Sequence, residues 1–144
     1  MVRIIEPNTP QEWNAYYQLR YDTLRKPWNQ PPGSEKDEIE DQCIHLFALS
    51  NDAPAGVCRI QYNSADEAQV RFMGVDAQLR GQKIGHRLLQ EAEKIAMQNG
   101  RKYMTLQARE EAVKFYESAG YSIVEKTFLM WGTIQHFRMN KTLK

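Results

Sequence analysis

The stretch that decides the fold is "VDAQLRGQKIGHRLLQEAEKIA", residues 75–96, in which an apolar run leads through a short glycine-containing segment into a helix. Apolar residues from Ile84 to Ala96 recur at helical spacing, so they share one face and predict a helix packed on a core. Asn99 and Gly100 follow and favour the left-handed turn that ends many helices. The segment therefore predicts the step from a buried strand to an amphipathic helix.

The residues between the strand and the helix combine charge with little side-chain bulk. Arg80 and Lys83 are basic, and Gly81 and Gly85 leave the backbone bare. Because the first N–H groups of a helix are unpaired and carry partial positive charge, such a segment favours a phosphate group. Neither the P-loop nor the dinucleotide-binding motif fits the residues at this spacing. The glycines are also compatible with a tight turn and close helix packing, and the two bases with a solvated surface.

The pattern outward from this stretch predicts strands and helices in a fixed order. A strand, a helix and three further strands precede the opening helix, and a strand, a short helix and two strands follow it. A strand, helix, strand sequence in the middle implies one parallel crossover in an otherwise antiparallel sheet, and hence a single mixed α/β domain over residues 1–144. The expected strands are 3–6, 43–50, 55–62, 68–75, 103–108, 121–126 and 136–143, and the other expected helices are 9–24 and 111–119.

Two segments near the N-terminus differ in their patterns. Thr9 followed by Pro10 and Glu12 predicts a capped helix start, and the aromatic stripe that follows is typical of a core face. Residues 25–42 are rich in proline and glycine at first and acidic afterwards, and they predict a long ordered or semi-ordered loop that can include a helical turn.

The composition narrows the class of protein. Lys and Arg total 19 and Asp and Glu total 18, giving a formal net charge of +1, which argues against nucleic-acid binding. No apolar stretch approaches the roughly 20 residues that span a bilayer, so we expect a cytoplasmic protein with no membrane association. Cys43 and Cys58 lack metal-ligand or redox spacing, and we expect reduced structural thiols and no metal site.

Two motifs resemble those of the GNAT superfamily of N-acyltransferases. Residues 80–85 are similar to its acyl-CoA-binding motif [RQ]-x-x-G-x-[GA], although Lys83 stands where the family usually has glycine. A lysine fits there only with a negative φ or with some accepted strain. The second motif, A-x-x-F-Y-x-x-x-G-[FY], is matched by Ala112, Phe115, Tyr116, Gly120 and Tyr121.

The resemblance implies a fold and a cofactor. The fold is a mostly antiparallel mixed sheet with helices on both faces, in which a parallel strand pair is splayed around acyl-CoA. Acetyl-CoA is the implied cofactor, with its pantetheine along the strand that ends at Val75 and its pyrophosphate on the N–H groups of residues 82–86. The implied cofactor-binding residues are Met73, Gly74, Val75, Arg80, Gly81, Gln82, Lys83, Ile84, Gly85, His86, Ala108, Arg109, Ala112, Phe115 and Tyr116.

The resemblance also implies catalytic roles. Tyr116 matches the tyrosine that acts as general acid toward the departing CoA thiolate, although an aromatic in this place is also compatible with a core position. The general base has three candidates: Glu67 at the edge of a strand, His45 at the start of another, and His136 before the last strand. A chain of water molecules leading to solvent is a fourth route for the proton.

The acceptor amine remains open, as either a small molecule or a peptide. Acidic residues 35–41 favour a cationic amine, whereas Arg71 pointing into the site favours an acceptor with a carboxylate or phosphate, and these indications disagree. A non-catalytic acyl-CoA-binding module is the alternative to an enzyme. Exposure of the apolar residues 128–131 would indicate a homodimer surface. The expected acceptor-binding residues are Arg20, Tyr21, Arg25, Trp28 and Arg71.

Overall fold

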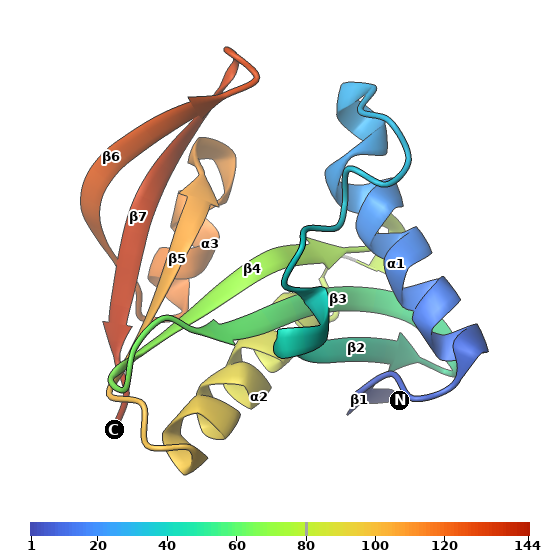
Figure 1. Cartoon of the computed structure of the whole chain (residues 1–144), viewed down its shortest axis with the longest axis horizontal. Helices are drawn as coiled ribbons and strands as arrows, with labels where there is room; N and C mark the ends of the chain where they lie inside the picture. Colours follow the sequence, from blue (N-terminus) through green and yellow to red (C-terminus); the bar gives the residue numbers. More distant parts are fainter. Residues whose placement is uncertain (80) are drawn as a thin grey trace.

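The computed structural model describes residues 1–79 and 81–144. Its order of strands and α-helices is the one that the sequence predicts (Figure 1). The strands are β1 (Val2–Ile5), β2 (Ile44–Ser50), β3 (Ala53–Tyr62), β4 (Glu67–Val75), β5 (Tyr103–Arg109), β6 (Ser122–Met130) and β7 (Ile134–Thr142). The α-helices are α1 (Pro10–Leu24), α2 (Ile84–Gln98) and α3 (Val113–Ser118). Short 3₁₀ helices are η1 (Lys26–Trp28), η2 (Glu40–Gln42), η3 (Ala77–Leu79) and η4 (Glu110–Ala112).

The strands form a seven-stranded sheet in the order β1-β2-β3-β4-β5-β7-β6. Within the described residues, β4 and β5 are the parallel pair, and the other neighbouring strands are antiparallel. A helix between β4 and β5 makes this possible, because parallel neighbours need a long crossover. The expected mixed sheet with one parallel crossover is therefore confirmed.

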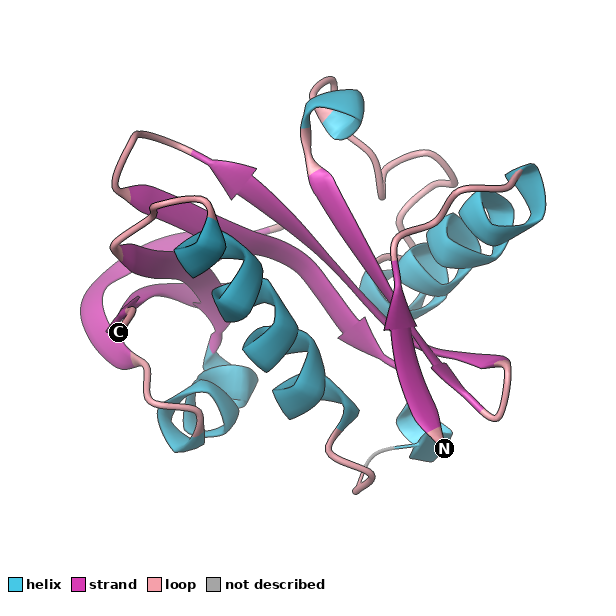
Figure 2. Ribbon diagram, turned by 90° about the horizontal axis from the view of Figure 1, so that it is seen from below, coloured by secondary structure: helices cyan, strands magenta, loops and turns pink. Residues whose placement is uncertain are grey.

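Helices cover both faces of the sheet (Figure 2). On one face, Tyr16 and Leu19 of α1 pack against Phe47 of β2 and Val57 of β3. On the other face lies the larger core, to which α2 contributes Ile84, Leu88, Leu89, Ala92 and Ala96. Successive residues of a strand point to opposite faces, so β2 and β3 supply side chains to both cores.

The local signals at the helix ends act as expected. The Thr9 side chain accepts from the N–H of Glu12, whose carboxylate accepts from the N–H of Thr9, so α1 begins with a capping box. The helix α2 ends at Gln98, and Gly100 follows with φ +80. Residues between η1 and η2 form turns, which confirms the predicted long loop. No α-helix in the described part of the chain is long and apolar enough to cross a membrane.

The closing hairpin is longer than the sequence pattern predicts. Residues 127–135 were expected to connect two strands, but β6 continues to Met130 and β7 begins at Ile134. The ladder has two register shifts in β6, between Ile123 and Glu125 and between Lys126 and Leu129. Such irregularities break the strict alternation of side chains on which a strand prediction depends. The sequence pattern therefore does not show where β6 ends and where β7 begins.

The parallel pair diverges along its length. Pairing between β4 and β5 runs from Glu67 and Tyr103 to Val70 and Leu106, and then stops. Both strands continue, β4 to Val75 and β5 to Arg109. Figure 1 shows the two strands separating toward their carboxyl ends.

Candidate active site

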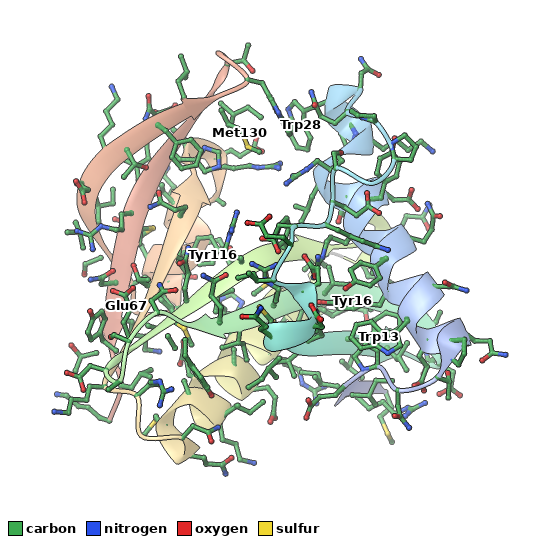
Figure 3. All side chains as sticks on the ribbon, in the orientation of Figure 1. Trp13, Tyr16, Trp28, Glu67, Tyr116 and Met130 are labelled. Carbon is green, nitrogen blue, oxygen red and sulfur yellow. The ribbon has the colours of Figure 1, made fainter. Side chains whose placement is uncertain are left out.

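A cavity of about 330 Å³ lies where β4 and β5 separate. Its walls come from both strands, from the segment after α1, from α3 and from the β6–β7 hairpin (Figure 3). Of the residues expected to bind cofactor or acceptor, or to act as acid or base, ten line it: Arg25, Trp28, Arg71, Met73, Gly74, Val75, Arg109, Ala112, Tyr116 and His136.

The β4 wall has a bulge. Phe72 and Met73 lie opposite the single residue Cys58 of β3, and Phe72 has φ +53, a left-handed value that is uncommon for a side chain of this size. Gly74 lies so close to α1 that a Cβ there would collide with Thr23. Because β5 has already left the ladder, the edge of β4 that faces away from β3 has no neighbouring strand beyond the bulge among the described residues.

The approach to α2 has the geometry of an anion cradle. Gly81 has φ +98, and Lys83, the residue before the helix, has φ 59 and ψ 29. Lys83 thus takes the left-handed conformation that glycine adopts freely and that a side chain adopts at about 1–2 kcal/mol. Gly81, Gln82 and Lys83 are exposed, and the helix begins at Ile84 with N–H groups that a helix cannot pair internally. Arg80, expected to add charge here, lies outside the described residues.

Gly85 serves packing as well as backbone access. A Cβ there would lie 2.8 Å from the ring of Phe115 on α3. His86 packs edge-on against the same ring, with centroids 4.7 Å apart, and its Nε2 lies 3.1 Å from Ser118 Oγ. Phe115 therefore fixes α3 to the start of α2 and does not itself line the cavity, and the buried Ala108 does not line it either.

Tyr116 lies on the cavity wall and is 8% exposed. Burial raises the pKa of its phenol, and the nearby Arg109 charge offsets this only in part. The phenol therefore keeps its proton at neutral pH. Its hydroxyl makes no hydrogen bond to another described residue, which leaves it available to donate to a ligand in the cavity.

His136 lines the same cavity from β7. Its Nδ1 lies 3.0 Å from the carbonyl oxygen of Ile134, and because a carbonyl can only accept, Nδ1 carries the proton. Burial lowers the pKa of His136 and outweighs this hydrogen bond, so the ring is neutral near pH 7. Phe128 stacks on the ring at 4.3 Å between centroids. Nε2 is then the unprotonated nitrogen, and its lone pair accepts from no other described residue.

The other two base candidates lie outside the cavity lining. Glu67 is at the first residue of β4, where its carboxylate accepts from Tyr103 Oη at 2.8 Å and from Asn63 Nδ2 at 2.6 Å; Figure 3 shows it apart from Tyr116. His45 lies beneath α1 with both ring nitrogens engaged, Nδ1 by Tyr16 Oη at 2.8 Å and Nε2 by the carbonyl oxygen of Glu40 at 2.6 Å.

Known proteins share this sequence and fold. Residues 20–143 match the model of a family described as the acetyltransferase (GNAT) domain. Over 142 residues, 98% of this chain and 99% of the other, the sequence is 30% identical to YjcF, an uncharacterized N-acetyltransferase of Bacillus subtilis (strain 168). The chain belongs to the GNAT acetyltransferase family.

Solved structures of other GNAT-like proteins agree with this fold. A Lactobacillus plantarum protein provisionally named an N-acetyltransferase superposes with a TM-score of 0.87 at 23% identity, over 99% of both chains. An aminoglycoside 6'-N-acetyltransferase in complex with coenzyme A gives 0.81 at 18% identity, over 100% of this chain and 97% of that one. The predicted family, fold class and enzyme class are confirmed: the chain is a GNAT N-acetyltransferase.

Two of the residues expected at the acceptor site of this GNAT chain have other surroundings. Arg20 is fully buried, and its guanidinium donates to Glu40 Oε1 at 2.9 Å and to Tyr16 Oη at 2.8 Å. The Tyr21 hydroxyl donates to the carbonyl oxygen of Gln30 at 2.8 Å. Neither residue lines the cavity; they hold the loop after α1 in place.

Several lining residues of the GNAT cavity were missed by the sequence analysis. Phe128 and Met130, two positions apart on β6, face the cavity, and Trp131 beyond them packs on Trp28 with ring centroids 6.1 Å apart. Figure 3 shows Met130 and Trp28 approaching each other from opposite sides. The spacing of two between these apolar residues is a strand signal that could have identified them. Glu111 also lines the cavity, and no sequence motif or residue spacing identifies it as a site residue.

Proposed function

We propose that the enzyme transfers an acetyl group from acetyl-CoA to a primary amine of a small molecule or peptide, by direct attack within a ternary complex. The observation that supports this most is the cavity between the diverging strands, with Tyr116 on one wall and His136 on another. Bound acetyl-CoA supplies the thioester whose acetyl group is transferred. The residues of the chain bind, orient and move protons around it.

The residues fit such a cofactor in two places. The edge of β4 from Met73 to Val75 has free main-chain groups, which are suited to pairing with the amides of a pantetheine arm as a further strand would. The N–H groups at the start of α2, with Gly81 and Lys83 in left-handed conformations, are suited to a diphosphate. We also propose that Arg80 contributes charge there.

Tyr116 is proposed as the proton donor to the departing thiolate. Because burial raises the pKa of its phenol, the proton is present at working pH. A thiol has a pKa of about 8.5 and is already a fair leaving group, so the expected contribution of a general acid is in the ordinary range of about 10²- to 10⁴-fold.

His136 is proposed as the acceptor of the amine proton. The Ile134 carbonyl fixes the tautomer, and the Phe128 ring fixes the imidazole plane, so Nε2 presents a lone pair in an oriented ring. Of the three candidate bases, His136 alone lines the cavity within the described residues.

The proposal covers residues 1–144 as one catalytic domain acting in the cytoplasm.

The test is thiol release from acetyl-CoA over a panel of amino acids, polyamines, aminosugars and peptides. We expect turnover with at least one acceptor and a fall in kcat of about 10²- to 10⁴-fold for Tyr116→Phe and for His136→Gln. Tyr121→Phe is the matched control, because it removes a buried hydroxyl, bound to Glu93, from a tyrosine that does not line the cavity.

The alternative, a non-catalytic acyl-CoA-binding module, predicts a different outcome. Calorimetry would then detect CoA binding while no amine releases thiol. An unchanged kcat in Tyr116→Phe would remove the proton-donor role while leaving the transfer reaction itself intact.

A further inference from the structure

Two arginine side chains meet at the end of α1, on the cavity wall. Arg25 Nη1 donates to the carbonyl oxygen of Leu24 at 2.9 Å, and Arg109 Nη2 donates to the same oxygen at 3.2 Å. Arg25 follows the last residue of α1 and Arg109 is the last residue of β5, and both line the cavity. A shared acceptor therefore brings two positive charges side by side.

Neither charge has a carboxylate partner. Among the described residues, no carboxylate oxygen lies within 4 Å of either guanidinium. Arg25 is only 8% exposed, and its remaining hydrogen bond goes from Nε to the carbonyl oxygen of Ser34 at 3.0 Å. Charged side chains are rarely buried to this extent unless they are paired.

The Arg25 and Arg109 guanidinium faces rest on aromatic rings. Arg25 lies 5.5 Å from the centroids of Phe72 and Trp131, and Arg109 lies 4.0 Å from that of Trp28. Ring faces attract a cation and fix its plane, but they carry no net charge. Nη2 of Arg25 donates to none of the described residues and is accessible to solvent. The aromatic surroundings thus hold a free donor in a fixed direction at the cavity.

The neighbouring negative charge is too small to neutralise the pair. The carboxyl end of α1 supplies about half a charge at Leu24. Glu35 and Glu111 act on the two arginines from beyond ion-pair distance. Burial lowers the pKa of Arg25, and the charge of Arg109 lowers it further, so both are cations in a poorly solvated place.

The acidic loop does not change this balance. Two of its carboxylates are already paired: Asp37 Oδ1 with Arg59 at 2.7 Å, and Glu40 with Arg59 at 2.8 Å and Arg20 at 2.9 Å. The buried Glu35 carboxylate accepts from the Gly33 N–H at 2.7 Å instead. Arg71, which also lines the cavity, takes the second oxygen of Asp37 at 3.4 Å. The paired carboxylates therefore offer little attraction to a cationic acceptor, and Arg71 is itself partly neutralised by Asp37. Arg25 and Arg109 are then the cavity cations without an ion pair among the described residues.

We infer that the acceptor is a small amine that carries a carboxylate or phosphate group, and that this anion binds to Arg25 and Arg109 while the amine faces the cavity. The inference rests on the proposed acetyl transfer and narrows its substrate. Two guanidinium forks match the planar geometry of a carboxylate and the oxygens of a phosphate. A cavity of about 330 Å³, shared with the acyl end of the cofactor, suits an acceptor of amino-acid size.

The experiment compares amines with and without the anionic group. Thiol release is measured for amino acids against their carboxamides, and for phosphoethanolamine against ethanolamine. We expect kcat/KM to favour the anionic member by roughly 10- to 100-fold, the range of one charge-assisted hydrogen bond. The two pairs distinguish a carboxylate from a phosphate as the preferred anion.

Variants connect the preference to the two arginines. We expect Arg25→Met and Arg109→Met each to reduce the preference for the anion by roughly 10-fold or more, mostly through KM. Arg101→Met is the matched control: Arg101 donates to a main-chain carbonyl and lies 3.8 Å from the Tyr62 centroid, but it is not at the cavity. Arg109→Met decides the question if Arg25→Met does not fold.

Failure of the inference is distinguishable from failure of the proposed function. Turnover with equal or higher kcat/KM for carboxamides or polyamines would overturn the inference and leave acetyl transfer standing. A preference that survives in both Met variants would also overturn it. If no amine releases thiol, calorimetry with N-acetyl amino acids and their amides still measures the anion site, and binding of the acid alone would support it.

Discussion

Two sets of arginines near the Phe72 ring have opposite surroundings. The guanidinium carbons of Arg20 and Arg59 lie 4.4 and 4.8 Å from the ring centroid, and that of Arg25 lies 5.5 Å from it. Arg20 and Arg59 are fully buried and form ion pairs, whereas Arg25 and its neighbour Arg109 form none with the described residues. The same residue type thus appears in two electrostatic states within one small region.

The difference distinguishes arginines with a structural role, Arg20 and Arg59, from arginines whose charge is available to a ligand, Arg25 and Arg109. Arg20 and Arg59 link α1 and β3 to the acidic loop through Asp37 and Glu40, and that link orders the loop beside the cavity. Within the described part of the chain, Arg25 and Arg109 are hydrogen-bonded only to main-chain carbonyls and lie against ring faces. Such contacts orient a guanidinium without neutralising it, so compensation is left to whatever binds in the cavity.

Breaking the paired set should have the largest effect. Glu40→Gln places an amide among Arg20, Arg59 and the Asp37 N–H, and it leaves two fully buried cations with one carboxylate. Loss of one partner from a buried ion pair lowers the free energy of unfolding by about 3–5 kcal/mol, and we expect that range in urea denaturation. Glu110→Gln, on an exposed residue, is the control. A loss below about 1 kcal/mol would show that the network is not structural.

Acid should weaken the paired set in a defined pH range. Burial opposes ionisation of Glu40, but the Arg20 charge and the hydrogen bonds to the carboxylate outweigh it and hold its pKa below the ordinary 4.5. A lowered folded-state pKa gives stability that is complete above about pH 4.5 and is lost as the pH falls through the folded value. Urea midpoints between pH 7 and pH 3 should therefore fall less steeply in Glu40→Gln than in wild type. Identical slopes would contradict the pairing.

The fold was predictable because local signals agreed with it. The apolar face of α2, the capping box at Thr9 and the stop at Gly100 each depend on a few neighbouring residues. The strand, helix, strand order then predicts a parallel pair. The position of Tyr116 beside that pair is what the family resemblance implies, and His136 was one of three candidate bases. These features need no knowledge of distant contacts.

The charge arrangement was not predictable in the same way. Asp37 could attract a ligand or neutralise Arg59, and the loop conformation decides which. Asp37 and Arg59 are 22 positions apart, and residue spacing does not predict that they meet. Glu67 was a reasonable base by strand position, but it lies where β4 and β5 are still paired, before the cavity opens. Lys83 has φ 59, which is the strained one of the two alternatives that the motif left open at this position.

The smallest expected change in stability comes from the unpaired set, and it sharpens the comparison most. Arg25→Met removes a guanidinium that no carboxylate neutralises, and the methionine can still pack against Phe72 and Trp131. Replacing an uncompensated buried charge by an apolar side chain is commonly neutral or stabilising, so we expect the free energy of unfolding to stay within about 1 kcal/mol of wild type or to rise. Urea denaturation of Arg25→Met and of Arg20→Met measures the difference in stability loss between the two sets. Arg20→Met removes one of the ion-pair partners of Glu40. If Arg25→Met instead loses as much stability as Arg20→Met, Arg25 is a structural residue like Arg20, and the division between the two sets fails.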